Sequence, residues 1–360
     1  MSRIRFGVWA AMALILVPLA GAQSYTVTDL GVITGGDETI PAAIDNHGWV
    51  AGHAYTNSEP YAFLWTPTEG IRNLGTLPGG IESFALGVND SGTVVGFSGA
   101  ESGNSAFLWT QKGGMQNLGT LGGGSIEVSA NGINNSGQVV GYAVLADNTT
   151  THAFLWTQAG GMQDLGTLGG DYSAAYAIND AGEVVGKSLL PGNPSIYHAF
   201  LWTQAGGMQD LGALGEKQQI TTGLAINDQG TVVGSSGSYE LTSAFVWTQS
   251  HGIRSLGAGE SVASGINDAG EVVGGYGAVD NAFVWTPTQR LQNLNNLYST
   301  KLRLGAGAGR GDQPVGADHD NRNDWRPVPR RSFDSHELAQ AGSLQKSRRD
   351  AGATITAAVQ

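Results

Sequence analysis

Histidines and carboxylates are the side chains of this 360-residue sequence best suited to acid–base or metal chemistry, because the chain contains no cysteine. The seven histidines are His47, His53, His152, His198, His251, His319 and His336. Their spacing assembles no serine–histidine–aspartate set, and strict G-x-S-x-G, Walker and dinucleotide patterns are absent. His336-Glu337 begins like a zinc-protease motif, but Gln340 stands where a second histidine is needed. We therefore predict no catalytic residue, no metal ligand and no cofactor.

Aspartates recur at one position of a repeated glycine turn, at Asp90, Asp180, Asp228 and Asp268. Hard oxygen ligands suit calcium, but each turn offers too few carboxylates for an EF-type loop. We interpret these aspartates as turn residues, with bound calcium as the alternative. Catalysis generally requires one copy of a repeat to differ from the others, and we identify no such copy here.

Three short signatures recur in a fixed order with a spacing of 38 to 48 residues. The first is a hairpin turn of the type INDxGxVVG, at 44–52, 88–96, 133–141, 178–186, 226–234 and 266–274. The second is AFLWT or AFVWT, which begins at Ala62, Ala106, Ala153, Ala199, Ala244 and Ala282. The third is a leucine strand ending in a glycine turn, centred on Leu30, Leu74, Leu118, Leu165, Leu211, Leu256 and Leu294. This period is typical of a four-stranded propeller blade.

Each repeat is predicted to contain four strands. The turn between the first two has the chemistry of a type I turn closed by a glycine at positive φ. AFLWT is apolar on both faces, so both faces must be covered, as happens when blades stack. Stretches rich in Ala, Gly and Ser before each turn, such as 173–180, suit an inner strand near a crowded axis. The predicted fold is an all-β propeller of six four-stranded repeats of about 45 residues.

The N-terminus resembles a secretory signal peptide. Arg3 and Arg5 precede an apolar run at 6–20, and Ala20-Gly21-Ala22 fits a cleavage site before Gln23. We therefore expect a secreted or periplasmic protein with no membrane span. From Gln23 to Thr300 the chain has six Lys and Arg against 23 Asp and Glu, a net charge of −17. Such a surface repels phosphate backbones, so nucleic acid is excluded as a partner.

The leucine strand occurs seven times, whereas the hairpin and the aromatic strand occur six times. In a ring closed by mixing the two termini, the first leucine strand would complete a seventh blade. Reading 309–318 one nucleotide along allows AGAINQSGQI, which has the pattern of the missing hairpin. We divide the chain into a signal peptide at 1–22, a propeller of six complete repeats at 23–299 and a low-order tail at 300–360. The tail is interpreted as a frameshifted seventh repeat of a seven-bladed ancestor, with an unrelated tail as the alternative.

The combination of xAFLWT, INDxGxVVG and GGMQDLGTLGG resembles the HAF repeat family, described as probable extracellular repeat proteins of bacteria. The resemblance runs from about Tyr25 to Asn296, and the His-Ala-Phe triplet itself occurs at 152–154 and 198–200. The family implies secretion and a repeat fold, and it implies no known activity or ligand.

The leading functional hypothesis is a monomeric binding or scaffold module for an extracellular carbohydrate or protein ligand. Loops such as 142–151 and 187–197 differ in length while the strands repeat, which suits a display surface. The alternatives are a glycan hydrolase or lyase, which would need paired carboxylates near the axis, and a truncated family member without function. Two arrangements stay open: six blades that close on themselves, or a ring with a gap where the seventh belongs.

Overall fold

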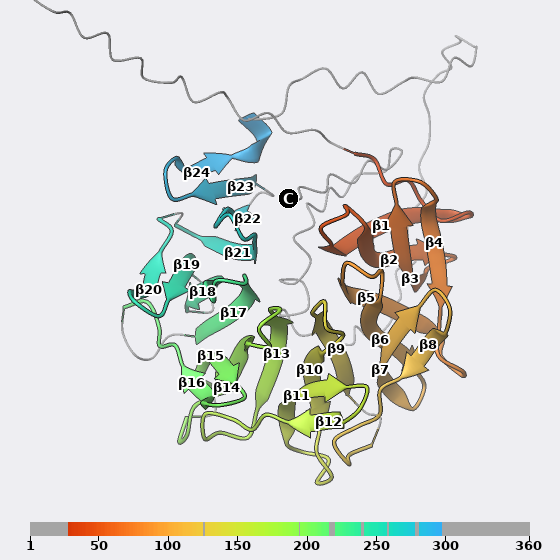
Figure 1. The fold of residues 1–360 in the computed structure, drawn as a ribbon, viewed down its shortest axis with the longest axis horizontal. Helices are drawn as coiled ribbons and strands as arrows, with labels where there is room; N and C mark the ends of the chain where they lie inside the picture. The colour runs from red at the N-terminus through yellow and green to blue at the C-terminus, as the bar shows by residue number, and fades with distance from the viewer. Residues whose placement is uncertain are drawn as a thin grey trace, which may run out of the picture.

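The computed structural model describes residues 28–124, 127–193, 195–215, 220–238, 241–257, 259–277 and 281–296. These residues form six sheets, each an antiparallel four-stranded meander. The sheets stand around a central axis as the blades of a propeller (Figure 1). The predicted six-bladed all-β propeller is thereby confirmed. The predicted signal peptide at 1–22 and tail at 300–360 lie outside the described residues.

The strands follow one another in chain order from blade 1 to blade 6. Blade 1 contains β1 (Gly36–Ile44), β2 (Val50–Thr56), β3 (Glu59–Thr66) and β4 (Gly70–Gly75). Blade 2 contains β5 (Glu82–Val88), β6 (Val94–Ala100), β7 (Gly103–Thr110) and β8 (Gly114–Asn117). Blade 3 contains β9 (Val128–Ile133), β10 (Val139–Val144), β11 (Thr151–Thr157) and β12 (Gly161–Asp164). Blade 4 contains β13 (Ser173–Ile178), β14 (Val184–Leu189), β15 (Tyr197–Thr203) and β16 (Gly207–Asp210).

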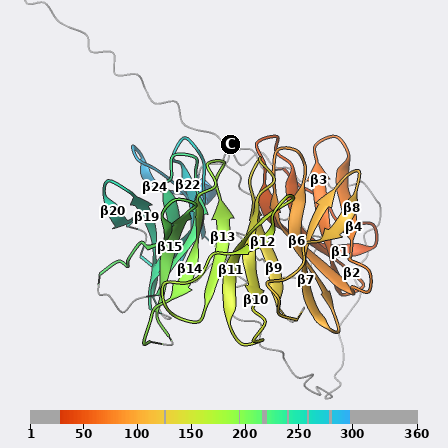
Figure 2. The same ribbon diagram turned by 60° about the horizontal axis from the view of Figure 1, so that its bottom comes forward.

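Blade 5 contains β17 (Ile220–Ile226), β18 (Val232–Gly237), β19 (Thr242–Thr248) and β20 (Gly252–Ser255). Blade 6 contains β21 (Ser261–Ile266), β22 (Val272–Tyr276), β23 (Asn281–Thr286) and β24 (Arg290–Asn293), followed by the 3₁₀ turn η1 (Leu294–Asn296). Within the described ranges, no helix has the length and apolar character needed to cross a bilayer. Figure 2 shows the blades from the side, with neighbouring sheets stacked face to face.

Each sequence signature takes the place in the blade that its pattern predicts. The hairpin turn joins the inner strand to the second strand, and its glycine has a positive φ, 71° at Gly92 and 79° at Gly182. The Gly92 amide donates to the Asn89 carbonyl over 2.8 Å, which is the hydrogen bond that closes a β-turn. AFLWT lies in the third strand, and the fourth strand is largely exposed, as in GMQD of β12.

The glycine that ends INDxGxVVG is required by a close approach between the first two strands. Each inner strand has a bulge opposite this glycine, for example between Ala175 and Ala177 opposite Gly186. A Cβ atom here would lie 1.9 to 2.1 Å from an inner-strand carbonyl oxygen at all six positions, Gly52, Gly96, Gly141, Gly186, Gly234 and Gly274. No real side chain tolerates that separation, so the repeat needs glycine at this site.

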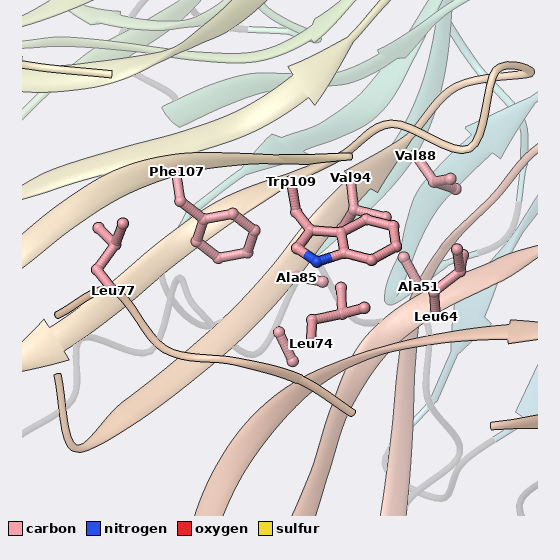
Figure 3. Close-up of a cluster of buried hydrophobic side chains, with 10 residues drawn as sticks. Ala51, Leu64, Leu74, Leu77, Ala85, Val88, Val94, Phe107 and Trp109 are labelled. Atoms are coloured by element: carbon pink, nitrogen blue, oxygen red, sulfur yellow. The ribbon is translucent and has the colours of Figure 1, made fainter. Parts of the chain in front are cut away.

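The hydrophobic core is divided among the spaces between blades. In blade 2, Phe107 and Trp109 point from one face of β7 into the core shared with blade 1. They pack there with Leu64 and Leu74, as Figure 3 shows. Ala106, on the opposite face of β7, belongs to the core shared with blade 3. Both faces of AFLWT are therefore buried because each face serves a different interface.

The ring of six blades is not closed by a sixth interface of the same kind. Strands of consecutive blades pack together from blade 1 to blade 6, but the described residues show no comparable packing between blade 6 and blade 1. In Figure 1 the first blade and the last blade stand apart at the top of the ring. Of the two arrangements left open by the sequence, the structure has the ring with a gap.

The face of blade 1 at this gap has only part of the normal core. Leu30 and Ile33 pack on Val50, Ala54 and Phe63, in the way that Leu74 and Leu77 pack in the next interface. Within the described ranges, no blade supplies the remaining partners. Ile44 is consequently 38% exposed, whereas its counterpart Ile178 in blade 4 is 8% exposed. A seventh repeat would cover this face; it stays a prediction, because 300–360 lie outside the described residues.

The open face can be tested by comparing two isoleucines at the same repeat position. Ile178→Ala is expected to lower the free energy of unfolding by about 2–5 kcal/mol, the usual cost of truncating a buried isoleucine. Ile44→Ala is expected to cost less than about 1 kcal/mol, because the side chain is already partly in solvent. Denaturant unfolding of both variants measures the difference. Equal losses would show that something covers the blade 1 face in solution.

The close approach of the strands can be tested with adjacent glycines in β22. Gly274→Ala should lower stability by about 1–3 kcal/mol or more, since its methyl group would meet the Val262 carbonyl oxygen at 2.0 Å. Gly275→Ala is the matched control, because the nearest atom to its methyl group is 3.9 Å away. Thermal unfolding of the two variants gives the comparison. A similar midpoint for both would contradict the strand geometry described above.

Candidate functional site

The inner strands surround a cavity of about 790 Å³ on the propeller axis. Its wall consists largely of small and aliphatic residues of β1, β5, β9, β13, β17 and β21, as the Ala, Gly and Ser content of these strands predicts. The hairpin turns between first and second strands also contribute to its lining. A cavity of this size fits a small-molecule or side-chain ligand.

The turns bring twelve polar residues together as what we call the axial rim. The first position of each turn holds Asp45, Asn89, Asn134, Asn179, Asn227 and Asn267. The second position holds Asn46, Asp90, Asn135, Asp180, Asp228 and Asp268. All twelve line the cavity.

Asparagines at the first position hold their own turn and also reach the next blade. The side-chain oxygen of Asn89 accepts from the amides of Ser91 and Thr93 over 3.2 and 3.1 Å. Its amide nitrogen donates to the Asn134 carbonyl of blade 3 over 3.0 Å. The same bond joins Asn134 to Asn179, Asn179 to Asn227 and Asn227 to Asn267, over 3.0 to 3.1 Å.

Residues at the second position form a parallel set of bonds between blades. The Asn46 amide donates to Asp90 over 3.0 Å, and the Asp90 amide donates to Asn135 over 3.0 Å. The bonds continue to Asp180, Asp228 and Asp268 over 2.8 to 2.9 Å. The aspartates predicted as turn residues therefore link blades, while the preceding asparagines hold the turns. The sequence of a single hairpin does not predict this link between blades, because the amide and the aspartate that it joins are 40 to 48 residues apart.

Asp90 is held in its ionised form by this arrangement. Burial alone would raise the pKa of its carboxyl, but hydrogen bonds from the side chain and amide of Asn46 and from Asn135 outweigh it and lower the pKa. Both oxygens of Asp90 are thereby engaged. By contrast, the second oxygens of Asp228 and Asp268 accept no hydrogen bond among the described residues, so they are free to bind a ligand.

Blade 1 breaks the symmetry of the rim, which the sequence analysis did not recognise. Asp45 stands where the other five blades have asparagine, and His47 occurs only in this copy of the turn. Asp45, His47 and Asp90 bring ligand atoms within 4.8 Å of one another. Aligning IDNHG with the other five turns would have identified this difference. In the described parts of the chain, no such group of three includes Asp180, Asp228 or Asp268, the other aspartates of the calcium alternative.

The histidines of the two His-Ala-Phe triplets are paired with aspartates of the fourth strand. His152 lies 2.8 Å from Asp164, and His198 lies 2.9 Å from Asp210. In the other four blades neither partner is present. The position of the histidine holds Tyr61, Ser105, Ser243 and Asn281, and that of the aspartate holds Asn73, Asn117, Ser255 and Asn293. The histidine and the aspartate therefore occur together, which indicates that the pair holds the third strand to the fourth.

The remaining histidines are separate from these groups. His53 lies in β2, packed against the rings of Tyr55 and Phe84 at 5.6 and 4.7 Å. His251 lies in an exposed turn beside Ser250. His319 and His336 fall outside the described residues.

Comparisons with known proteins find no family and only remote similarity to solved structures. No protein-family model matches the chain, and no curated protein matches it in sequence. Among solved structures, the propeller domain of the Trilobed protease from Pyrococcus furiosus is similar at 9% identity and a TM-score of 0.49, with 72% of this chain and 84% of that chain covered.

Two further solved structures show a similar degree of likeness. An oligogalacturonate lyase in complex with manganese is 10% identical at a TM-score of 0.48, over 77% of this chain and 80% of that chain. TolB from Acinetobacter baumannii is 12% identical at a TM-score of 0.44 over 59% of this chain. The match spans about half of TolB, 52% of its length. Likeness at this level says nothing of ligand or activity, and the blade count rests on the six sheets themselves.

His53 is expected to make stability depend on pH. Burial lowers its pKa from 6.5 to about 4, so the folded state resists a proton that the unfolded chain accepts. The free energy of unfolding should therefore be highest above pH 6.5 and fall by about 3 kcal/mol as pH drops towards 4. His53→Phe, which copies Phe97 of blade 2, should remove this part of the slope. Denaturant unfolding at several pH values measures it, and parallel slopes for both proteins would argue against a buried neutral imidazole.

Proposed function

We propose that this chain is a secreted or periplasmic binding module of the HAF repeat type, which acts as a monomer and holds its ligand at the axial rim. The observation that carries the proposal is the ring of oxygen acceptors around the cavity, at Asp90, Asp180, Asp228 and Asp268. The signal-like N-terminus and the three recurring signatures support the location and the family. The proposal assigns no catalytic step to the chain.

The rim favours a ligand that brings hydrogen-bond donors and positive charge. Two of its carboxylates, Asp228 and Asp268, each have an oxygen that is not used in the bonds between blades. The chain around them carries a net charge of −17 from Gln23 to Thr300. Such a field attracts cations over long range and repels anions. Of the two ligand classes considered, a protein segment bearing lysine or arginine therefore fits better than a neutral carbohydrate.

A hexalysine peptide and neutral maltohexaose are suitable probes for these two classes. We expect hexalysine to bind the intact protein with an affinity that falls as salt is raised, because the attraction is electrostatic. Asp228→Asn together with Asp268→Asn should weaken this binding by at least about tenfold, the effect of losing charge-assisted hydrogen bonds. Isothermal titration calorimetry measures both affinities.

A matched variant controls for the loss of net charge. Glu101→Gln together with Glu127→Gln removes the same two charges from exposed positions that do not line the cavity, and should leave hexalysine binding within about twofold, because exposed charges act weakly at a distance. Equal weakening in both double variants would contradict a site at the rim. Preferred binding of maltohexaose would move the ligand to the carbohydrate class.

A further inference from the structure

Asp45 has a second carboxylate oxygen where the asparagines of the other five turns have a side-chain nitrogen. Its Oδ1 accepts from the amides of His47 and Trp49 over 2.9 and 2.8 Å. The side-chain oxygen of Asn89 makes the equivalent two bonds in blade 2. Because Oδ1 takes the place of the asparagine oxygen, Oδ2 takes the place of the asparagine nitrogen. An oxygen acceptor thus replaces the N–H donor at this point of the rim.

This exchange removes the side-chain donor between blades 1 and 2 and leaves a buried oxygen of Asp45 without a hydrogen bond. In blades 2 to 5 the asparagine nitrogen donates to the main-chain carbonyl of the next blade. An ionised Asp45 cannot donate to Asn89 in this way. Its side chain is only 1% exposed, and Oδ2 has no hydrogen-bond partner. A buried carboxylate oxygen without a donor is costly, so the site calls for a positively charged partner.

His47 and Asp90 lie where they can share such a partner with Asp45. The Nδ1 atom of His47 is 3.7 Å from Oδ2 of Asp45, too far for a hydrogen bond but suited to two atoms that bind one ion. Atoms of all three residues lie within 4.8 Å of one another. Asp90 accepts three hydrogen bonds, from the amide and side chain of Asn46 and from Asn135. A carboxylate has about four lone-pair sites, so one remains for a metal.

We propose that Asp45, His47 and Asp90 bind a divalent transition-metal ion such as Zn²⁺ between blade 1 and blade 2. One imidazole and two carboxylates are a ligand set that Zn²⁺ accepts, whereas Ca²⁺ and Mg²⁺ prefer oxygen ligands alone. Three protein ligands leave a coordination position for water or another group. The side chain of His47 is 59% exposed, so the ion can enter from solvent. This site is independent of the proposed binding of a basic segment at Asp228 and Asp268.

The test uses tag-free protein treated with a chelator and then titrated with Zn²⁺ or Ca²⁺. We expect Zn²⁺, and not Ca²⁺, to raise the midpoint of thermal unfolding and to bind with a measurable affinity in calorimetry. Co²⁺ should give the visible absorption of a nitrogen- and oxygen-ligated ion. His47→Ser, which copies Ser91 of blade 2, should weaken Zn²⁺ binding by at least about tenfold, since it removes the one nitrogen ligand. Its unfolding without metal should be unchanged.

Asp45→Asn is a second test, because this variant should be more stable than the parent without metal and should not respond to Zn²⁺. It restores the repeat asparagine and its donor to Asn89, so metal-free Asp45→Asn should unfold at a higher temperature than the metal-free parent. Its midpoint should no longer respond to Zn²⁺. Asp268→Asn, at the far end of the rim, should leave the Zn²⁺ response intact and serves as the control. The proposal is overturned if Zn²⁺ has no effect on the parent, as expected if Asp45 carries a proton, or if His47→Ser binds Zn²⁺ as tightly.

Discussion

Burial of the aromatic strand between neighbouring blades is the interaction on which the architecture depends. No blade has a core of its own: Phe and Trp of AFLWT enter one interface, while Ala and Leu of the same strand enter the other. Phe107 and Phe154 are fully buried in this way, as are Phe200, Phe245 and Phe283, whereas Phe63 of blade 1 is buried against Leu30 and Ile33. Each sheet is therefore stable only beside another sheet, which is the logic of repeat proteins in general. The inner strands, the cavity and the rim are positioned by this stacking.

The strand order could be predicted from sequence because the information for it is local and is repeated. The Asn and Gly of INDxG form the turn of the same hairpin. The apolar composition of AFLWT indicates by itself that this strand is buried on both faces. The rim could not be predicted in the same way. The carboxylate of Asp228 accepts a hydrogen bond from the backbone amide of Asp180, 48 residues earlier in the chain. This pairing follows only from the stacking of blades. The exceptional copy at Asp45 was in principle visible, since it differs from five aligned turns.

The rim combines a structural role with the proposed binding role in the same residues. Asn89, Asn134, Asn179 and Asn227 use their side-chain oxygens within their own turns and their amide nitrogens between blades. Burial of these amides makes each bond expensive to lose. The aspartates use one oxygen for the neighbouring blade and leave the other for solvent where no asparagine side chain reaches it, as at Asp228. A polar ring can thus hold the blades in register and still offer acceptors to a ligand.

The gap between blade 6 and blade 1 gives this molecule a mechanical freedom that a sealed ring lacks. In a closed propeller the last interface fixes the sum of all the angles between blades, and therefore the diameter of the central opening. Among the residues that the structure describes, five interfaces lie in series and no sixth constrains them. A rotation of a few degrees at each would add up along the arc and widen or narrow the axial opening with little loss of buried area. The width of that opening is consequently an adjustable property of the arc.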